Sequence, residues 1–455
     1  MKNITGILRE AVTKRGEKRV AITPDYAKSV VDWGYRLIVQ PARNPETGEI
    51  KRAFDDEEYR KIGAVISEDL SAARVIFGLK EIPVHRIIPG KAYYFFSHTH
   101  KGQQKNRKML KRLKDTASTV IDYELITNER NQRLITAFTY NAGYAGMVDT
   151  LWSLGKRLQI LGIDNVFSDI PQAVEGADLL TVKNLIKDTA ERIKQFGTPE
   201  SIPPVIVCFL GKGKTAHGAR TIFDLLPHEN IAFKQAEHIF NKGSRKKLYA
   251  LQLDTSTMFK PKTGSKIIPK NYHDLFYRER RELYYSYAQE FESRLDEVLP
   301  FITVLVNCIN WSPQYPRTVT KEMMKRIYRV SDTLKVIGDI TCDPEGSIEF
   351  SKETWIDNPV YIYDPFGNKF TDGFAGEGIA VMAVTNLPCE FSADASRQFS
   401  HDLFPFLPRI LEADYNKKIE KSGLPPEVKR AVILWNGSFT ENYSYMKSFI
   451  KDISD

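Results

Sequence analysis

The chain has 455 residues, of which 42% are hydrophobic, and a formal net charge of +8. This length exceeds what one hydrophobic core usually supports, so two domains are expected. No apolar run reaches 18 residues and the first residues lack a long apolar segment, so the usual patterns of a membrane span and a secretory signal are missing.

The positive charge is spread among 57 acidic residues, and the densest basic cluster, at residues 106–114, has helical spacing. We therefore expect no nucleic-acid or membrane partner, and instead a basic site for small anions. The four cysteines lie far apart and form no CxxC pair. This predicts buried, reduced thiols, no metal site, and a reducing compartment, the cytoplasm.

Residues 4–136 alternate short apolar runs with amphipathic stretches, which predicts an α/β fold with a mainly parallel sheet. The runs that predict strands are at residues 4–10, 36–40, 73–81, 91–98 and 118–124. Helices are expected at 24–34 and 55–63. A longer helix is predicted over residues 142–162, and the small residues at its start would allow close backbone approach.

A second α/β unit begins with an apolar strand at 205–210, followed by Gly211, Gly213 and Gly218 and a helix at 219–226. A glycine turn between a strand and a helix can hold a pyrophosphate, although the spacing misses the strict G-x-G-x-x-G pattern and an ordinary turn is the alternative. Residues 255–300 predict an insertion that contains one charged helix at 273–299. Further strands are expected at 302–309, 334–340 and 378–387, and helices at 392–415.

Several motifs resemble, in order and spacing, the alanine dehydrogenase/saccharopine dehydrogenase superfamily. They are "EKRVAITP" (17–24), "GLKE" (78–81), "FFSHTHKGQ" (95–103), "VIDYE" (120–124) and "AGYAGM" (142–147). The likeness extends through "GKGKTAHGA", "VNCINW" and "GSIEF", which are typical of the lysine–ketoglutarate reductase half of bifunctional aminoadipic semialdehyde synthase.

This resemblance implies two Rossmann-like domains with the active site in the cleft between them. The first would be discontinuous, 1–140 plus 392–455, and the second would span 141–391. The implied reaction condenses L-lysine with 2-oxoglutarate and reduces the imine to saccharopine. We expect the saccharopine-cleaving half to be absent; a homo-oligomer and a separate downstream saccharopine dehydrogenase stay open. The alternatives are an alanine-dehydrogenase-like or other imine reductase, and a non-catalytic nucleotide or metabolite sensor.

The chemistry needs groups that move protons near neutral pH, a task for which histidine and lysine are suited. By the resemblance, Lys80 and His98 are the catalytic residues, and both end predicted strands. His100 is expected to be structural. The resemblance also implies a set of substrate-binding side chains: Arg19, Lys101, Gln103, Glu81, Glu124 and Phe138.

The predicted coenzyme contacts are Gly211, Gly213, Gly218, Lys234, Asn307, Asp339 and Asn386. The strand after the glycine turn is predicted at 230–234, and its end carries Lys234 rather than the acid of NAD-specific folds. The resemblance to the reductase half of aminoadipic semialdehyde synthase also implies NADPH, and we therefore expect NADPH as the coenzyme. The alternative is NADH, if Glu237 reaches back to the ribose.

Overall fold

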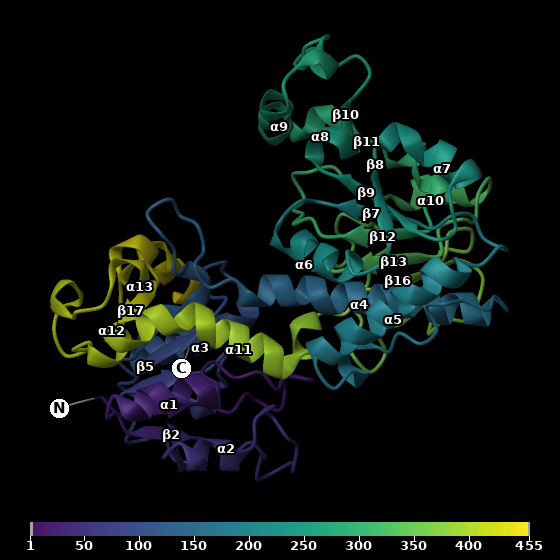
Figure 1. The fold of residues 1–455 in the computed structure, drawn as a ribbon. Helices are drawn as coiled ribbons and strands as arrows, with labels where there is room; N and C mark the ends of the chain where they lie inside the picture. Colours follow the sequence, from purple (N-terminus) through teal and green to yellow (C-terminus); the bar gives the residue numbers. More distant parts are fainter. Residues whose placement is uncertain (1–2, 454–455) are drawn as a thin grey trace. The chain divides into compact units, whose positions relative to one another are not determined.

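The chain divides into two units in the computed structural model, which describes residues 3–453 (Figure 1). The first unit combines Met1–Phe138 with Ser392–Asp455, and the second is Thr139–Phe391. These boundaries lie within two residues of those expected. Each unit has its own eight-stranded sheet, so the α/β class is confirmed.

The sheet of the first unit has the strand order β18-β17-β6-β5-β4-β1-β2-β3. Its strands are β1 (Thr5–Ile7), β2 (Leu37–Val39), β3 (Val65–Ile66), β4 (Val75–Phe77), β5 (Ala92–Phe95), β6 (Thr119–Asp122), β17 (Val432–Trp435) and β18 (Ser438–Phe439). Strands β1 to β6 pair in parallel, and all five strands predicted in this region are present. The helices expected at 392–415 are present, and beyond them the sequence analysis missed two strands: β17 pairs antiparallel with β6, and β18 with β17.

Alternate residues of a strand point to opposite faces of the sheet, and here both faces are apolar. Helices therefore cover both faces. Phe77 and Tyr94 pack with α1 and the C-terminal helices, whereas Ile76 and Tyr93 pack with α3. The helices of this unit are α1 (Pro24–Asp32), α2 (Asp56–Lys61), α3 (Arg107–Asp115), α11 (Ser392–Leu403), α12 (Leu407–Glu412) and α13 (Pro426–Arg430).

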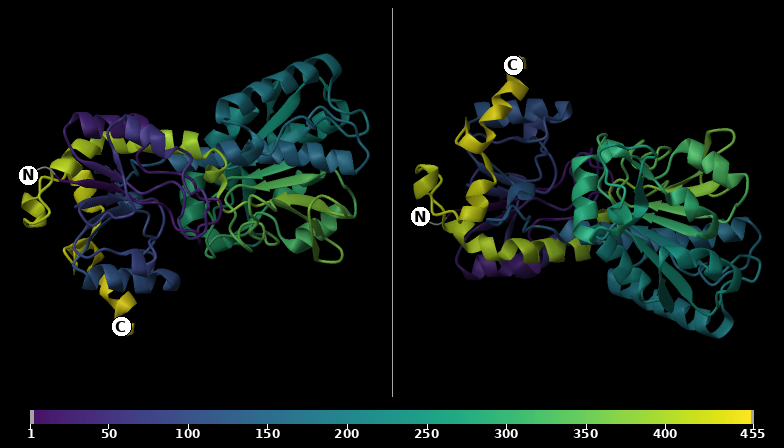
Figure 2. Two further views of the ribbon diagram at one scale, coloured as in Figure 1. Left: turned by 90° about the horizontal axis from the view of Figure 1, so that it is seen from below. Right: turned by 90° about the horizontal axis from the view of Figure 1, so that it is seen from above.

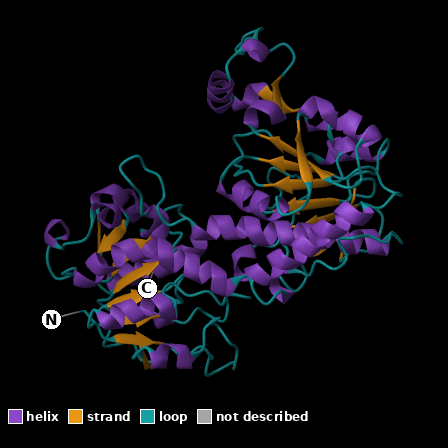
Figure 3. Cartoon of the chain, viewed as in Figure 1, coloured by secondary structure: helices purple, strands orange, loops and turns teal. Residues whose placement is uncertain are grey.

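The second sheet has the order β15-β14-β16-β13-β12-β7-β9-β8, and a separate hairpin pairs β10 with β11 (Figure 3). The strands are β7 (Ile206–Leu210), β8 (His228–Ile231), β9 (Leu248–Leu253), β10 (Phe259–Pro261), β11 (Phe291–Ser293), β12 (Val304–Asn307), β13 (Val336–Asp339), β14 (Val360–Asp364), β15 (Lys369–Asp372) and β16 (Ile379–Met382). Strand β14 pairs antiparallel with both of its neighbours, β15 and β16, and the six strands from β16 to β8 in this order pair in parallel.

Two helical layers enclose this sheet, as the two views of Figure 2 show. Val207 and Phe209 pack with α4, α5 and α6, and Cys208 faces the layer that contains α10. The helices are α4 (Ala137–Ile160), α5 (Leu179–Phe196), α6 (Lys214–Phe223), α7 (Ala236–Lys242), α8 (Thr255–Met258), α9 (Tyr277–Ser286) and α10 (Lys321–Tyr328). The predicted long helix corresponds to α4.

Two predictions for the second unit were wrong. The strand expected at 230–234 ends at Ile231, and Lys234 lies in a short 3₁₀ turn, Phe233–Gln235. The helix expected over 273–299 ends at Ser286, because buried Phe291 then pairs with β10 in a hairpin.

Gly218 does not lie in the turn but inside α6, where it packs against α4. A Cβ atom there would lie 2.3 Å from the carbonyl oxygen of Tyr140, and one on Gly143 would lie 2.2 Å from that of Thr215. The two helices therefore cross backbone to backbone, as the small residues at the start of the long helix led us to expect.

The four cysteines are free thiols; three are buried and Cys342 is half-buried. Within residues 3–453, no helix has both the length and the apolar character that a membrane crossing requires.

Candidate active site and coenzyme cavity

The predicted catalytic residues follow neighbouring strands of the first sheet. Lys80 and Glu81 come just after β4, and His98 follows β5, its parallel neighbour. The C-terminal ends of parallel strands meet at one edge of the sheet, where ligands of open α/β sheets bind. The strand order therefore places the lysine and the histidine at the same edge.

His98 is linked to Glu81 and Lys14. Its Nδ1 lies 3.0 Å from Glu81 Oε1, and Lys14 Nζ lies 2.5 Å from Glu81 Oε2. Burial alone would raise the pKa of Glu81, but hydrogen bonds from His98 and Lys14 hold it well below its usual range. The ionised carboxylate accepts the Nδ1 proton, which leaves Nε2 of His98 as a proton acceptor. Glu81 and Lys14 also line a cavity of about 760 Å³ in this unit.

The backbone of His98 is held in an unusual conformation. Its φ is +50°, a left-handed value that residues other than glycine rarely adopt. The Asp122 carboxylate fixes this turn by accepting from the backbone N–H groups of Ser97, at 2.9 Å, and His98, at 3.2 Å. Strained residues of this kind are common where a side chain must be aimed at a ligand.

Lys80 lies beside two buried carboxyl groups that the sequence analysis missed. Glu10 accepts hydrogen bonds from the backbone N–H groups of Leu79 and Lys80. Burial and the nearby charge of Glu17 raise the pKa of Glu10 to about 7, and the Lys80 charge opposes this shift. A carboxyl that titrates near neutrality next to a predicted catalytic lysine is a candidate for proton transfer.

Arg19 is buried and forms an ion pair with Glu17 at 2.6 Å, and its guanidinium lies 4.2 Å from the centre of the Phe138 ring. Burial opposes ionisation of Glu17, but the Arg19 charge and hydrogen bonds lower its pKa far more. The structure thus brings together Arg19 and Phe138, two of the predicted substrate-binding residues. It also gives the arginine a protein carboxylate as partner, which the sequence analysis did not foresee.

A second group of charges surrounds Glu124. Lys101 Nζ lies 2.9 Å and Arg133 Nη2 2.5 Å from the same oxygen, Oε1. His100 Nε2 is 3.7 Å from Glu124 Oε2, so His100 packs against this group. Gln103 is exposed and contacts Asn106. Arg133 completes the cluster and has no sequence signal beyond its basic charge.

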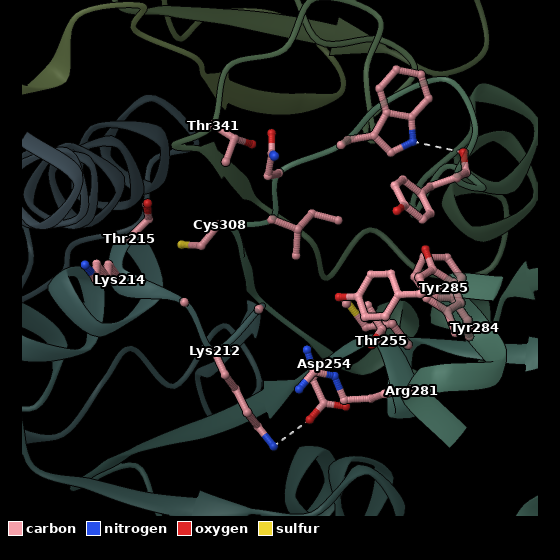
Figure 4. A pocket seen from close by; sticks show the side chains of 18 of the residues that line it. Lys212, Lys214, Thr215, Asp254, Thr255, Arg281, Tyr284, Tyr285, Cys308 and Thr341 are labelled. Atoms are coloured by element: carbon pink, nitrogen blue, oxygen red, sulfur yellow. Dashed lines mark hydrogen bonds and ion pairs between the residues drawn. The ribbon is translucent and has the colours of Figure 1, made fainter. Parts of the chain in front are cut away.

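The second unit has a cavity of about 720 Å³ at the C-terminal ends of β7, β9, β12 and β13 (Figure 4). Gly211, Lys212, Gly213 and Lys214 form one wall. Gly213 is the N-cap of α6 and no side chain caps the helix there. A Cβ atom on Gly213 would meet nothing within 4 Å, so the cavity reaches the backbone. Such a helix N-terminus fits a pyrophosphate.

The opposite wall is aromatic and comes from the segment that the sequence predicted as an insertion. Tyr277, Tyr284 and Tyr285 of α9 line the cavity, together with Trp311 and Tyr315. Tyr284 and Tyr315 stack at 5.8 Å between ring centres. Flat apolar surfaces of this kind suit the adenine ring of a dinucleotide.

Of the predicted coenzyme contacts, Gly211 and Gly213 line this cavity; in the described chain, its lining residues do not include Gly218, Lys234, Asn307, Asp339 or Asn386. Asp339 is 1% exposed, and its carboxylate is engaged by Ser351, Asn307 and Thr341. Cys308, which follows Asn307, and Thr341, two residues after Asp339, line the cavity instead. Asn386 lies after the end of another strand, β16. Asn307 and Asp339 thus join the ends of β12 and β13 to each other, and their contact with a coenzyme stays a prediction.

Comparisons with known proteins agree with this architecture. The family model of the N-terminal domain of alanine dehydrogenase/PNT matches residues 6–145, and that of the C-terminal domain matches residues 265–442. A solved L-alanine dehydrogenase aligns with a TM-score of 0.60 at 14% identity, covering 99% of this chain and 100% of its own. A transhydrogenase from Sinorhizobium meliloti aligns with a TM-score of 0.53 at 14% identity, covering 96% and 98%.

Curated relatives share more of the sequence. The Arabidopsis thaliana alpha-aminoadipic semialdehyde synthase is 33% identical over 97% of this chain and 41% of its own length. The mitochondrial enzyme of Rattus norvegicus is 29% identical over 97% and 47%. The NAD(+), L-lysine-forming saccharopine dehydrogenase of Neurospora crassa is 25% identical over 87% and 88%. The chain spans less than half the length of the two synthases, and it belongs to the alanine dehydrogenase/PNT family of oxidoreductases that use a nicotinamide coenzyme.

Proposed function

We propose that this chain condenses L-lysine with 2-oxoglutarate and reduces the imine to saccharopine. The observation that carries the proposal is the linked series Lys14, Glu81 and His98 beside Lys80, at adjoining strand ends. The sequence context supports it, because this chain matches aminoadipic semialdehyde synthases over 97% of its length.

The linked series provides a proton acceptor for the first step. The lysine amine must lose a proton before it attacks the keto carbon, and the carbinolamine oxygen must gain one before it leaves. His98 Nε2 accepts the first proton because Glu81 holds the proton on Nδ1. Lys80, positioned beside Glu10, is the group proposed to return a proton to the leaving oxygen.

The charges near Glu124 favour an anionic substrate. Lys101 and Arg133 share one carboxylate and are both about half exposed, so their remaining donor hydrogens can reach a substrate carboxylate. By contrast, Arg19 is balanced by Glu17. We therefore assign the first contact with 2-oxoglutarate to Lys101 and Arg133, with Arg19 and Phe138 as a more buried contact.

When a nicotinamide coenzyme is bound, it supplies the hydride for the imine. The residues placed to hold it are Gly211, Gly213 and the start of α6 for the pyrophosphate, and the aromatic wall for the adenine. That this cavity and the residues around His98 serve one reaction stays part of the proposal. The preference for NADPH loses its main argument, because Lys234 follows a strand that is not the neighbour of β7.

A substrate panel tests the function directly. The purified chain is incubated with NADH or NADPH, and coenzyme oxidation is followed with L-lysine plus 2-oxoglutarate and, separately, with pyruvate plus ammonia. We expect turnover only with the first pair, and saccharopine as the product identified by mass spectrometry. Turnover with pyruvate and ammonia would indicate an alanine-dehydrogenase-like enzyme. Coenzyme binding without turnover on either pair would indicate a sensor.

A further inference from the structure

The strand order of the second sheet decides which residue lies next to the adenosine ribose of a bound dinucleotide. In Rossmann-like folds this residue ends the strand beside the one that precedes the glycine turn. That neighbour is β9, since Leu210 pairs with Leu253, and the N–H of Gly211 donates to the Leu253 carbonyl at 2.8 Å. The residue after Leu253 is Asp254, which therefore lies directly beside the glycine turn.

The carboxylate of Asp254 is held in place and is ionised. The residue is 6% exposed, and its Oδ1 accepts from the backbone N–H of Ser256 at 3.0 Å and from the Ser256 hydroxyl at 2.7 Å. Lys212 Nζ lies 2.7 Å from Oδ2 (Figure 4). Burial opposes ionisation, yet the hydrogen bonds from Lys212 and Ser256 lower the pKa of Asp254 below its ordinary value.

We propose that Asp254 makes this chain select NADH over NADPH. The inference rests on the proposed nicotinamide-dependent function. Hydroxyl groups of an unmodified ribose can donate hydrogen bonds to a fixed carboxylate. A 2′-phosphate in the same place carries up to two negative charges and would lie against an ionised, nearly buried acid.

In the described chain the cavity is lined by three cations, Lys212, Lys214 and Arg281, and two of them are engaged by other side chains. Lys212 is half exposed, and Asp254 neutralises its charge. Arg281 lies over the rings of Tyr277 and Tyr285, at 5.6 Å from each centre. Lys234, which was one of the two grounds for expecting NADPH, is exposed and, in the described chain, is not among the residues that line the cavity.

The test is direct binding of each reduced coenzyme to the full chain, measured by fluorescence titration at fixed ionic strength. The wild-type chain should bind NADH at least tenfold more tightly than NADPH, since a charge-assisted hydrogen bond is worth roughly 1.5–3 kcal/mol, or about ten- to a hundredfold. Asp254→Asn keeps the acceptor that caps α8 and removes only the charge. It should shift the ratio of the two dissociation constants toward NADPH by at least tenfold.

Two further variants sharpen the result. Lys234→Asp should leave the ratio unchanged. Lys212→Gln should weaken NADPH binding further, because it removes the cation beside Asp254. The inference is overturned if the wild-type chain binds NADPH as tightly as NADH, or if Asp254→Asn leaves the ratio unaltered; binding of neither coenzyme would overturn it together with the coenzyme assignment. If NADH binds selectively but lysine and 2-oxoglutarate are not turned over, the proposed function fails and this inference stands.

Discussion

A buried pair of carboxyl groups should make the stability of the second unit depend on pH. Asp149, on α4, accepts from the backbone N–H of Ala173 at 2.8 Å, and Glu390 accepts from that of Val174 at 3.1 Å. The remaining oxygens, Asp149 Oδ2 and Glu390 Oε1, are buried, and within residues 3–453 neither has a hydrogen-bond partner in the structure. The two carboxyl groups influence each other's pKa, and one proton held between them would satisfy both oxygens, because an ionised carboxylate can only accept a hydrogen bond.

The sign and size of the effect follow from proton binding. Burial raises the pKa of Asp149 to about 6, and the nearby Glu175 charge acts in the same direction. Burial, together with the Asp149 charge, raises the pKa of Glu390 well above its ordinary value. The unfolded chain releases both protons above about pH 4.5. A raised folded pKa gives stability that is complete below the unfolded pKa and is lost as the pH rises. With one proton more in the folded state, the loss is about 1.4 kcal/mol per pH unit.

Asp149→Asn removes this dependence without removing the hydrogen bonds. Its amide oxygen can still accept from Ala173, and its N–H group donates to Glu390 in place of the shared proton. We expect the free energy of unfolding of the wild-type chain to fall by about 1.4 kcal/mol for each pH unit over which the folded pair holds one proton more than the unfolded chain. The variant should lose most of that slope.

The assay is urea unfolding at a series of pH values, combined with hydrogen exchange of the amides of Ala173 and Val174. Asp188→Asn, which changes an exposed acid on α5, is the matched control and should keep the wild-type slope. An Asp149→Asn variant whose stability falls with pH as steeply as that of the wild type would refute the shared proton.

Three further outcomes are expected. Lys80→Met and His98→Gln should each lower kcat by about 10² or more while coenzyme binding persists; near-normal turnover in both, by steady-state kinetics, would reject their catalytic role. Arg19→Ala should lower the free energy of unfolding by about 3–5 kcal/mol, because it leaves buried Glu17 without its charge partner. Adding Glu17→Gln should restore most of this stability, as measured by urea unfolding. In the double variant, the KM for 2-oxoglutarate should rise about ten- to a hundredfold if Arg19 binds that substrate. Gly218→Ala should lower the free energy of unfolding by about 1–3 kcal/mol, because its Cβ would meet the Tyr140 carbonyl. Gly213→Ala, where the space is open, should melt close to the wild-type temperature. Equal melting temperatures of the two variants would contradict the close crossing of α4 and α6.

The first sheet was predictable because its central strands are short apolar runs whose side chains are buried on both faces. Such runs need no long-range information, and polar residues directly after them must lie at the edge of the sheet. Lys80, His98 and Glu124 could be placed for this reason, with the family resemblance to assign their roles. Their partners Lys14 and Glu17 come from the irregular segment after β1, which has no periodic pattern. Which charged side chains of this segment become buried depends on how the loop folds, so it could not be predicted from the sequence.

The segment at 273–299 shows the limit of helical periodicity. Its charged and aromatic residues fit a continuous helix, and α9 does form over its first part. The later part contains Phe291, which is buried because it pairs with Pro261 across the hairpin. The pairing with Pro261, thirty positions earlier, outweighs the local preference for a helix, and it cannot be predicted from the residues of the segment alone.

The order of β7, β8 and β9 was missed although the sequence contains a signal for it. Strands that are consecutive in sequence are usually neighbours in a sheet, so we predicted that the first strand after the glycine turn lies beside β7. A central strand of a parallel sheet is covered on both faces and must be almost wholly apolar. The strand "HENI" (228–231) exposes Glu229 and Asn230 and can form only an edge, whereas "LYALQL" (248–253) is nearly all buried. Burial therefore puts β9 beside β7, and the acid that ends it, Asp254, takes the position where coenzymes are distinguished.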